Sequence, residues 1–171
     1  MKGYVQVYTG DGKCKTTAAV GLIVRAAGSG LQVFFGQFLK GTPSGELRVL
    51  RERFPEVVAR QFGRRSFVRG KPSPADVQAA RAGLRELREA LCCGRYDLVI
   101  ADEANVAVTL GLLDLKDLLE LVASRPPEVE LVITGRGAHS RLIACADLVS
   151  EMKCRKHYFN RGVKSRKGIE C

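Results

Sequence analysis

A short apolar stretch that runs through a glycine- and lysine-rich turn into a helical stretch restricts the fold of this chain more than any other feature. Residues 4–8 (Tyr-Val-Gln-Val-Tyr) have the pattern of a strand, residues 9–17 (Thr-Gly-Asp-Gly-Lys-Cys-Lys-Thr-Thr) follow, and a helical run begins at residue 18. A strand, a glycine-rich loop and a helix in this order form a P-loop, in which backbone N–H groups surround phosphate oxygens and the helix N-terminus adds partial positive charge. We therefore predict a phosphate-binding site here.

The loop supplies the groups that a nucleoside triphosphate and its magnesium ion need. Lys15 adds a full positive charge, and the hydroxyl of Thr16 can ligate Mg²⁺. The residues of this segment predicted to contact the nucleotide are Thr9, Gly10, Asp11, Gly12, Lys13, Cys14, Lys15, Thr16 and Thr17.

The loop departs from the usual pattern at two positions. Thr9 stands where the motif normally opens with glycine, and Cys14 stands where glycine normally precedes the lysine. A side chain at position 14 either points toward the phosphates or requires a backbone angle that costs a residue other than glycine about 1 kcal/mol or more. Cys14 is therefore the residue most expected to change nucleotide affinity.

The rest of the chain alternates apolar, β-branched runs with helical patterns. The chain has 171 residues, of which 46% are apolar, and no linker or repeat divides it, so we expect one domain over residues 1–171. Such alternation predicts an α/β fold: a doubly wound, mostly parallel sheet of the P-loop nucleotide-binding type. The runs that carry this prediction are residues 4–8, 16–27, 31–38, 74–93, 98–101, 115–122 and 131–134.

Two helices are expected to contribute mainly to the core. The first begins after Ser73, which can cap it, and places Pro74 at a favourable first position. Its apolar residues fall at steps of three and four, which predicts one buried stripe made of Val77, Ala80, Leu84, Leu87 and Leu91. The second is expected to begin at Asp114 and to end before Pro126-Pro127, with its buried side made of Leu115, Leu118, Leu119 and Val122.

Two carboxylates follow the apolar run at residues 97–101. Asp102 and Glu103 would lie at the carboxyl end of a parallel strand, where a Mg²⁺ ion beside a P-loop needs acidic groups. The same residues could instead cap a helix over residues 104–111. Both roles are compatible if Asp102 and Glu103 divide them.

The chain is strongly basic, with a formal net charge of +10. This charge is compatible with a nucleic-acid partner or with an anionic small substrate. Only 6% of the residues are aromatic, so base stacking has little support and nucleic acid is an unlikely partner. The basic C-terminal tail, residues 153–171, carries seven Lys or Arg residues against Glu170 alone, and would be either a solvated terminus or a flap that faces the substrate.

Apolar stretches are all shorter than the roughly 20 residues that a membrane-spanning helix needs. The N-terminus continues directly into the first predicted strand without the apolar core of a signal peptide. We therefore expect a soluble, cytoplasmic protein that does not interact with membranes.

Several further segments, in the same order and spacing, make the chain similar to the corrinoid adenosyltransferases, also described as cob(I)yrinic acid a,c-diamide adenosyltransferases. The resemblance extends over nearly the whole chain. Beyond the loop it covers residues 33–41 (Val-Phe-Phe-Gly-Gln-Phe-Leu-Lys-Gly), 62–68, 97–107 (Asp-Leu-Val-Ile-Ala-Asp-Glu-Ala-Asn-Val-Ala), 132–138, 146–152, 156–159 and 167–170.

The resemblance implies a transferase that moves the 5′-deoxyadenosyl group of ATP to the Co(I) of a reduced corrinoid and releases inorganic triphosphate. Co(I) is itself a strong nucleophile, so the absence of an evident Ser, Cys or His activated by a base agrees with this reaction. The resemblance also implies that ATP is reversed relative to most P-loop enzymes, that Mg²⁺ is required, that an electron donor reduces the cobalt, and that the protein is a homodimer.

Site residues follow from the resemblance position by position. Thr16 and Glu103 are the implied Mg²⁺ ligands with Asp102 beside them, and Lys15, Thr16 and Glu103 form the catalytic group. Arg25 and Arg136 join Lys13 as candidates for nucleotide contacts. Corrinoid contacts are implied at Gln37, Lys40 and Phe67, the last near the lower face of the corrin. Arg136 could equally be an ordinary surface arginine and Phe67 an ordinary core residue.

Two alternative functions remain at this point. One is a P-loop ATPase that acts on nucleic acid, which the net charge of +10 suggests. The other is a corrinoid- or nucleotide-binding module in which Cys14 has ended catalysis.

Overall fold

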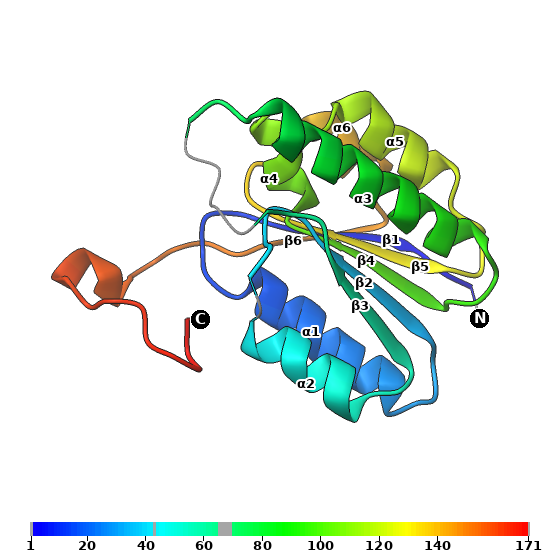
Figure 1. The fold of residues 1–171 in the computed structure, drawn as a ribbon, viewed down its shortest axis with the longest axis horizontal. Coiled ribbons are helices and arrows are strands. Elements are labelled where there is room, and N and C mark those ends of the chain that lie inside the picture. The colour runs from blue at the N-terminus through cyan, green and yellow to red at the C-terminus, as the bar shows by residue number, and fades with distance from the viewer. Residues whose placement is uncertain (1, 43, 65–69, 171) are drawn as a thin grey trace.

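The computed structural model describes residues 2–42, 44–64 and 70–170. One six-stranded sheet forms its centre, in the order β3-β2-β4-β5-β1-β6, and every strand pair in it is parallel (Figure 1). The strands are β1 (Val5–Thr9), β2 (Val33–Gln37), β3 (Val57–Gln61), β4 (Leu98–Asp102), β5 (Glu130–Thr134) and β6 (Leu148–Glu151). This topology confirms the predicted doubly wound α/β class.

Helices cover both faces of the sheet. In Figure 1, α1 (Lys15–Ala27) and α2 (Gly45–Arg53) lie on one face, and the remaining α-helices lie on the other. These are α3 (Pro74–Cys92), α4 (Ala104–Thr109), α5 (Leu115–Ala123) and α6 (Ser140–Cys145). A single 3₁₀ turn, η1 (Tyr158–Arg161), follows β6 in the described residues. None of the helices in the described ranges is both long and apolar enough to cross a bilayer.

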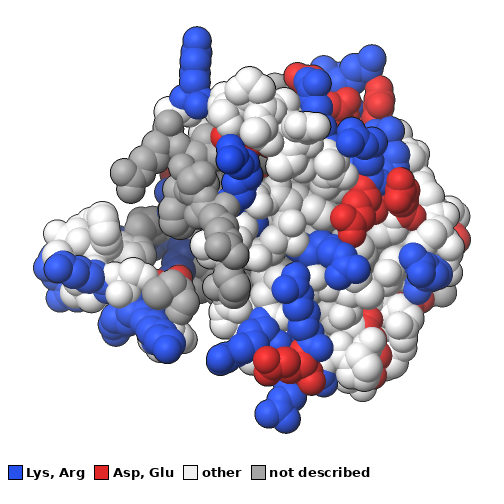
Figure 2. All heavy atoms as spheres, viewed as in Figure 1, with Lys and Arg blue, Asp and Glu red and all other residues white. Residues whose placement is uncertain are grey.

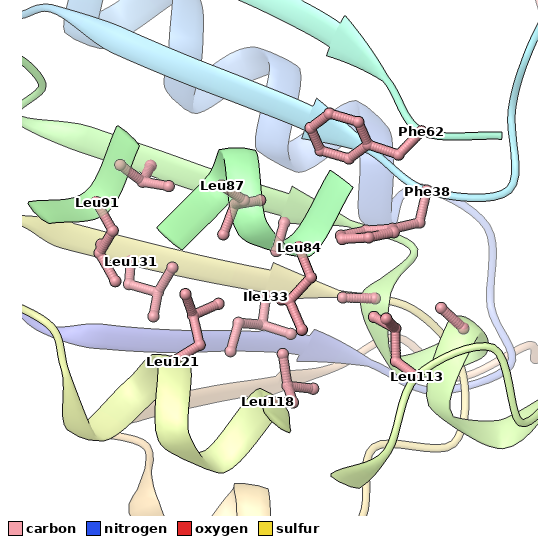
Figure 3. Close-up of a cluster of buried hydrophobic side chains, with 14 of the residues drawn as sticks. Phe38, Phe62, Leu84, Leu87, Leu91, Leu113, Leu118, Leu121, Leu131 and Ile133 are labelled. Atoms are coloured by element: carbon pink, nitrogen blue, oxygen red, sulfur yellow. The ribbon is translucent and has the colours of Figure 1, made fainter. Parts of the chain in front are cut away.

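The helix after Ser73 forms as predicted. Ser73 and Asp76 make a reciprocal capping box, and Pro74 occupies the first turn. Of the predicted stripe, Ala80, Leu84, Leu87 and Leu91 are buried and Val77 packs against them, so this face of α3 closes the core above the sheet (Figure 3).

The helix predicted after Asp114 is α5, with Asp114 as its N-cap. Leu118 and Leu121 are its fully buried residues, while Leu119 and Val122 are only partly buried. Leu121 was not among the predicted inward residues. It lies three residues after Leu118, on the same side of the helix.

Both edge strands were missing from the sequence-based expectation. The two segments, β3 and β6, pair on one side only, and most of β6 is exposed to solvent. Edge strands of this kind lack the continuous apolar run that marks a strand buried on both faces. Their sequences, Val-Val-Ala-Arg-Gln and Leu-Val-Ser-Glu, are therefore weak strand signals.

The strand order brings the predicted site together. Strand β5 lies between β1 and β4, so the loop after β1, the carboxylates after β4 and the residues after β5 all meet at the carboxyl edge of the sheet. Ligands of open parallel sheets bind at this edge.

Candidate nucleotide-binding site

The loop between β1 and α1 lies against the backbone that follows β6. The N–H of Gly12 donates to the carbonyl oxygen of Met152 at 2.6 Å, and the N–H of Met152 donates to the carbonyl oxygen of Thr9 at 2.8 Å. Gly10 has a φ of +93°, and a Cβ there would lie 2.5 Å from the Met152 carbonyl oxygen. Glycine is therefore required at position 10 by both backbone angle and space.

Cys14 precedes α1 with a φ of 93°, in the left-handed region. Of the two predicted consequences of a non-glycine residue there, the strained backbone is the one the structure shows. The thiol is exposed. Left-handed backbone disfavours an L-residue by roughly 1–2 kcal/mol, so the loop is strained at the residue before its central lysine.

Lys15 is buried beneath the loop. Its ammonium donates hydrogen bonds to the carbonyl oxygens of Gly10 and Gly12, both at 2.7 Å. Burial lowers the pKa of this ammonium, and the positive charge of Arg136 lowers it further. Lys15 thus fixes the loop conformation and places a positive charge at its centre.

Asp102 is the hub of a buried hydrogen-bond network at the end of β4. Its carboxylate accepts from the hydroxyl of Thr16 at 3.0 Å, from the hydroxyl of Thr134 at 2.6 Å and from the amide of Gln37 at 2.9 Å. The side-chain amide of Gln61 in turn donates to the side-chain oxygen of Gln37, Oε1, at 3.1 Å. Asp102, Thr134 and Gln37 have no exposed surface. Sequence reasoning identified Asp102, but not Thr134 or Gln61.

Glu103 directly follows Asp102, at the start of α4. It is the N-cap of α4 with a φ of 59°, yet its side chain makes no capping hydrogen bond. Its backbone N–H donates to the Thr134 hydroxyl at 3.0 Å. The predicted capping role is therefore wrong: the Glu103 side chain does not cap α4, and the Asp102 carboxylate is bonded to Thr16, Thr134 and Gln37 instead.

Charges of both signs surround the Glu103 carboxyl. Burial raises its pKa, and the neighbouring Asp102 carboxylate raises it further. The positive charges of Lys40, Lys15 and Arg136 act in the opposite direction. Three predicted site cations thus lie close enough to influence this one carboxylate.

The loop after β5 borders the P-loop. The N–H of Ala138 donates to the Thr9 hydroxyl at 3.2 Å, and Gly135 accepts at its carbonyl oxygen from the amide of Asn105 at 3.1 Å. Arg136 lies between these contacts and is exposed. The structure therefore brings Arg136 to the same end of the sheet as Lys15 and Glu103.

Other predicted residues are more distant or otherwise engaged. Arg25 is in the last turn of α1, ten residues after Lys15, or about 15 Å at the usual helical rise, so the structure does not bring it to the loop. Lys40 forms an ion pair with Glu46, with 3.6 Å between its Nζ and the carboxylate Oε1. Phe67 lies outside the described residues.

Asp11, Lys13 and Thr17, also predicted to contact the nucleotide, are exposed. Asp11 sits at the loop's surface, close enough to influence the charge on Lys15, and Thr17 lies on the exposed side of the first turn of α1. Lys13 is also exposed, and its ammonium contacts the C-terminal segment, where it forms an ion pair with Glu170 at 3.1 Å.

These features define a P-loop nucleotide-binding α/β protein. The fold is also similar to that in a crystal structure of the RadB recombinase, with a TM-score of 0.52 over 89% of this chain and 75% of that one at 14% identity, which supports the fold alone.

The family assignment comes from the sequence matched end to end. The model of the family described as "ATP:corrinoid adenosyltransferase BtuR/CobO/CobP" matches residues 1–171, and the chain belongs to this family. It is 35% identical to the corrinoid adenosyltransferase of Pseudomonas aeruginosa, covering 99% of this chain and 84% of that protein. It is 36% identical to the one of Escherichia coli and 37% identical to corrinoid adenosyltransferase CobA of Salmonella typhimurium, in each case over 99% of this chain and 86% of the relative.

Proposed function

We propose that this P-loop site transfers the 5′-deoxyadenosyl group of ATP to the Co(I) of a corrinoid. The observation that carries the proposal is the meeting of Lys15, Thr16 and Glu103 at one edge of the sheet, in a chain whose whole length matches an ATP:corrinoid adenosyltransferase family. The family assignment favours this activity over a nucleic-acid ATPase and over a catalytically inactive binding module.

The reaction requires the chain to position ATP and to stabilise the leaving group. The Co–C bond forms as the bond between C5′ and the triphosphate oxygen breaks, and the electron pair of that bond leaves with triphosphate. Positioning and electrostatic stabilisation are therefore the protein's main contributions. Lys15 and the backbone N–H groups of the loop would hold the triphosphate, with ATP reversed so that its ribose faces the corrinoid, and Arg136 would approach it from the loop after β5.

The residues at the edge of the sheet fit a magnesium ion. Thr16 offers a hydroxyl oxygen and Glu103 a carboxylate that no capping bond engages, which are the hard oxygen ligands that Mg²⁺ prefers. The described residues hold no cluster of three or more His, Cys, Asp or Glu side chains that could form a protein cage for a metal. This agrees with the common arrangement in which one or two protein ligands and the substrate phosphates share Mg²⁺. When bound, the ion would neutralise charge on the triphosphate.

Asp102 would act through Thr16 rather than on the ion directly. Its carboxylate already accepts from Thr16, Thr134 and Gln37 inside the protein. The bond from Thr16 turns its hydroxyl hydrogen toward Asp102, so the lone pairs of the hydroxyl oxygen face away from Asp102. The network would therefore fix the position of a ligand and leave Glu103 as the carboxylate nearest the ion.

Lys40, Gln37 and Phe67 are the proposed corrinoid contacts. Lys40 lies near enough to Glu103 to affect that carboxyl, which supports a place at the mouth of the site. Gln37 is fully buried and its amide is bonded on both sides, so its proposed influence on the corrinoid would act through Asp102. Phe67 is proposed from the resemblance alone.

We also propose a homodimer, a separate electron donor that reduces the cobalt, and a cytoplasmic location. These rest on the family resemblance. The matched relatives named above are all corrinoid adenosyltransferases, and Arg25, which is remote from the loop in its own chain, is exposed and so available to a second copy.

The test is an anaerobic assay that mixes chemically reduced cob(I)alamin with Mg-ATP. Formation of the Co–C bond is followed by absorbance, and released triphosphate is measured separately. Product that appears with equal amounts of triphosphate supports the proposal. Hydrolysis of ATP without Co–C bond formation would contradict it, and the Lys15→Met variant controls for contaminating activity.

A further inference from the structure

The ammonium of Lys13 uses all its hydrogen-bonding capacity on the C-terminal segment. It donates to the carbonyl oxygen of Ile169 at 3.1 Å, to the carboxylate of Glu170 at 3.1 Å and to the hydroxyl of Tyr158 at 3.2 Å. A lysine ammonium has three donors. In this conformation, Lys13 therefore has no donor left for a phosphate oxygen.

Glu170 holds this arrangement together. Its carboxylate accepts hydrogen bonds from the backbone N–H of Arg166 at 2.8 Å and from the Arg166 guanidinium at 3.0 and 3.2 Å, and it also accepts from the Tyr158 hydroxyl. The Arg166 guanidinium lies 4.9 Å from the centre of the Tyr158 ring. Although the segment is largely exposed, the Glu170 side chain is only 15% exposed. Its hydrogen bonds with Arg166, ahead of other causes, hold the pKa of the Glu170 carboxyl far below its usual range.

The same segment is attached to the P-loop at its other end. Met152 exchanges backbone hydrogen bonds with Thr9 and Gly12, and the chain then leaves the sheet and returns so that Glu170 meets Lys13 (Figure 1). Residues 153–170 therefore form a loop that both starts and ends on the nucleotide-binding loop. Several Lys and Arg side chains lie on this segment, at the left of Figure 2, and Glu170 is the sole acidic residue in residues 153–170.

We propose that the C-terminal segment, residues 153–170, is an internal competitor of the nucleotide, in which the Glu170 carboxylate occupies Lys13 until triphosphate displaces it. The proposal rests on the proposed function only in requiring that triphosphate binds the P-loop. Triphosphate carries several negative charges and Glu170 carries one, so the two anions repel each other at a shared cation and the triphosphate is favoured. Nucleotide binding then frees Lys13 from Tyr158, Ile169 and Glu170, and residues 158–170 lose the side-chain bonds that attach them to the P-loop.

Hydrogen exchange and calorimetry of the full-length protein test this directly, with inorganic triphosphate and Mg²⁺ as the probe. We expect triphosphate to speed amide exchange in residues 158–170 of the natural protein, where the Arg166 N–H is bonded to Glu170. Glu170→Gln should exchange rapidly without ligand and respond little to it. It should also bind triphosphate about two- to fivefold more tightly, the range that a partly exposed ion pair supports.

Two controls separate this effect from a general change in charge. Glu128→Gln removes the same charge at an exposed position just before β5, at the amino ends of the strands and away from the P-loop. It should change neither amide exchange in residues 158–170 nor triphosphate affinity. Tyr158→Phe keeps the ring but removes the hydroxyl, and should shift affinity in the same direction as Glu170→Gln but by less.

The other outcomes would overturn the inference in distinguishable ways. If triphosphate binds both proteins equally and slows exchange in residues 158–170, the segment closes over the nucleotide and does not compete with it. Weaker binding by Glu170→Gln would make Glu170 a supporting residue for Lys13. If neither protein binds triphosphate, the phosphate-binding role proposed for the loop fails together with this inference.

Discussion

The hydroxyl of Thr16 donates a hydrogen bond to the buried carboxylate of Asp102 at 3.0 Å, which joins the first turn of α1 to the end of β4. These residues are 86 positions apart in the chain. The bond connects the glycine-rich loop after β1 to the acidic residues after β4, so a change at Thr16 is expected to affect both parts of the proposed site.

Thr16→Val keeps the shape of the side chain and removes the oxygen. We expect adenosyl transfer to fall about 100-fold or more, the size seen when one positioned polar group is removed from an active site. Stability should fall by about 1 kcal/mol, because Asp102 loses one of its donors. Thr16→Ser restores the hydroxyl and should recover most of the activity; a serine variant as inactive as the valine variant would contradict a role for the oxygen.

Cys14→Gly should stabilise the protein. The φ of 93° at this position strains cysteine but not glycine. Relief of this strain stabilises the folded protein, while the greater flexibility of glycine stabilises the unfolded chain. We expect a net rise of up to about 1 kcal/mol in the free energy of unfolding. This corresponds to a rise in Tm of about 2–4 °C for a chain of this size. Cys14→Ala keeps the Cβ and should show no gain, so an equal rise in both variants would point to the thiol instead of the backbone.

Glu103→Gln should be more stable than the natural protein at neutral pH, yet inactive. Burial raises the pKa of the Glu103 carboxyl above its ordinary value of 4.5, so folding disfavours its ionised form. This penalty is absent below pH 4.5 and grows as the pH rises through the folded-state pKa. The Tm difference between the two proteins should therefore be largest at pH 7–8 and vanish near pH 4.

In activity, by contrast, the natural protein should exceed Glu103→Gln. A Mg²⁺ ligand must be deprotonated, so the Mg²⁺ affinity of the natural protein should decline at a higher pH than for an ordinary glutamate. Glu128→Gln, at an exposed position, should change neither Tm nor activity. Full activity of Glu103→Gln at saturating Mg²⁺ would remove Glu103 from the metal site.

Thr134→Val tests a residue that the sequence did not reveal. The Thr134 hydroxyl donates to Asp102 and accepts from the Glu103 N–H, so valine leaves a buried acceptor and a backbone donor without these partners. We expect a loss of about 1–3 kcal/mol in unfolding free energy. Urea denaturation measures the loss, and Thr134→Ser should restore most of it.

The sequence predicted those residues of the proposed site whose roles follow from the residues next to them in the chain. Lys15 and Thr16 follow from the spacing within one loop, and Asp102 and Glu103 follow from their place after one apolar strand. Thr134 and Gln61 have roles that depend on which strands are neighbours, and strand order involves contacts far apart in the chain. For the same reason, the sequence left open whether the C-terminal tail was a solvated terminus or a flap, since the partner of Glu170 is 157 positions away.

Lys15→Met should separate activity from stability. The Lys15 ammonium donates to the carbonyl oxygens of Gly10 and Gly12, but burial disfavours its charge and lowers its pKa. Losing the two hydrogen bonds and losing the buried charge therefore act in opposite directions on stability, and the change in Tm should be small.

Activity of Lys15→Met should fall about 100- to 1,000-fold, because triphosphate loses the cation at the centre of the loop. Lys15→Arg keeps the charge but places a larger, planar group under the loop, so it should remain well below the natural activity. A large drop in Tm for Lys15→Met, with activity falling only in proportion to the folded fraction, would show that Lys15 supports the loop without acting on the triphosphate.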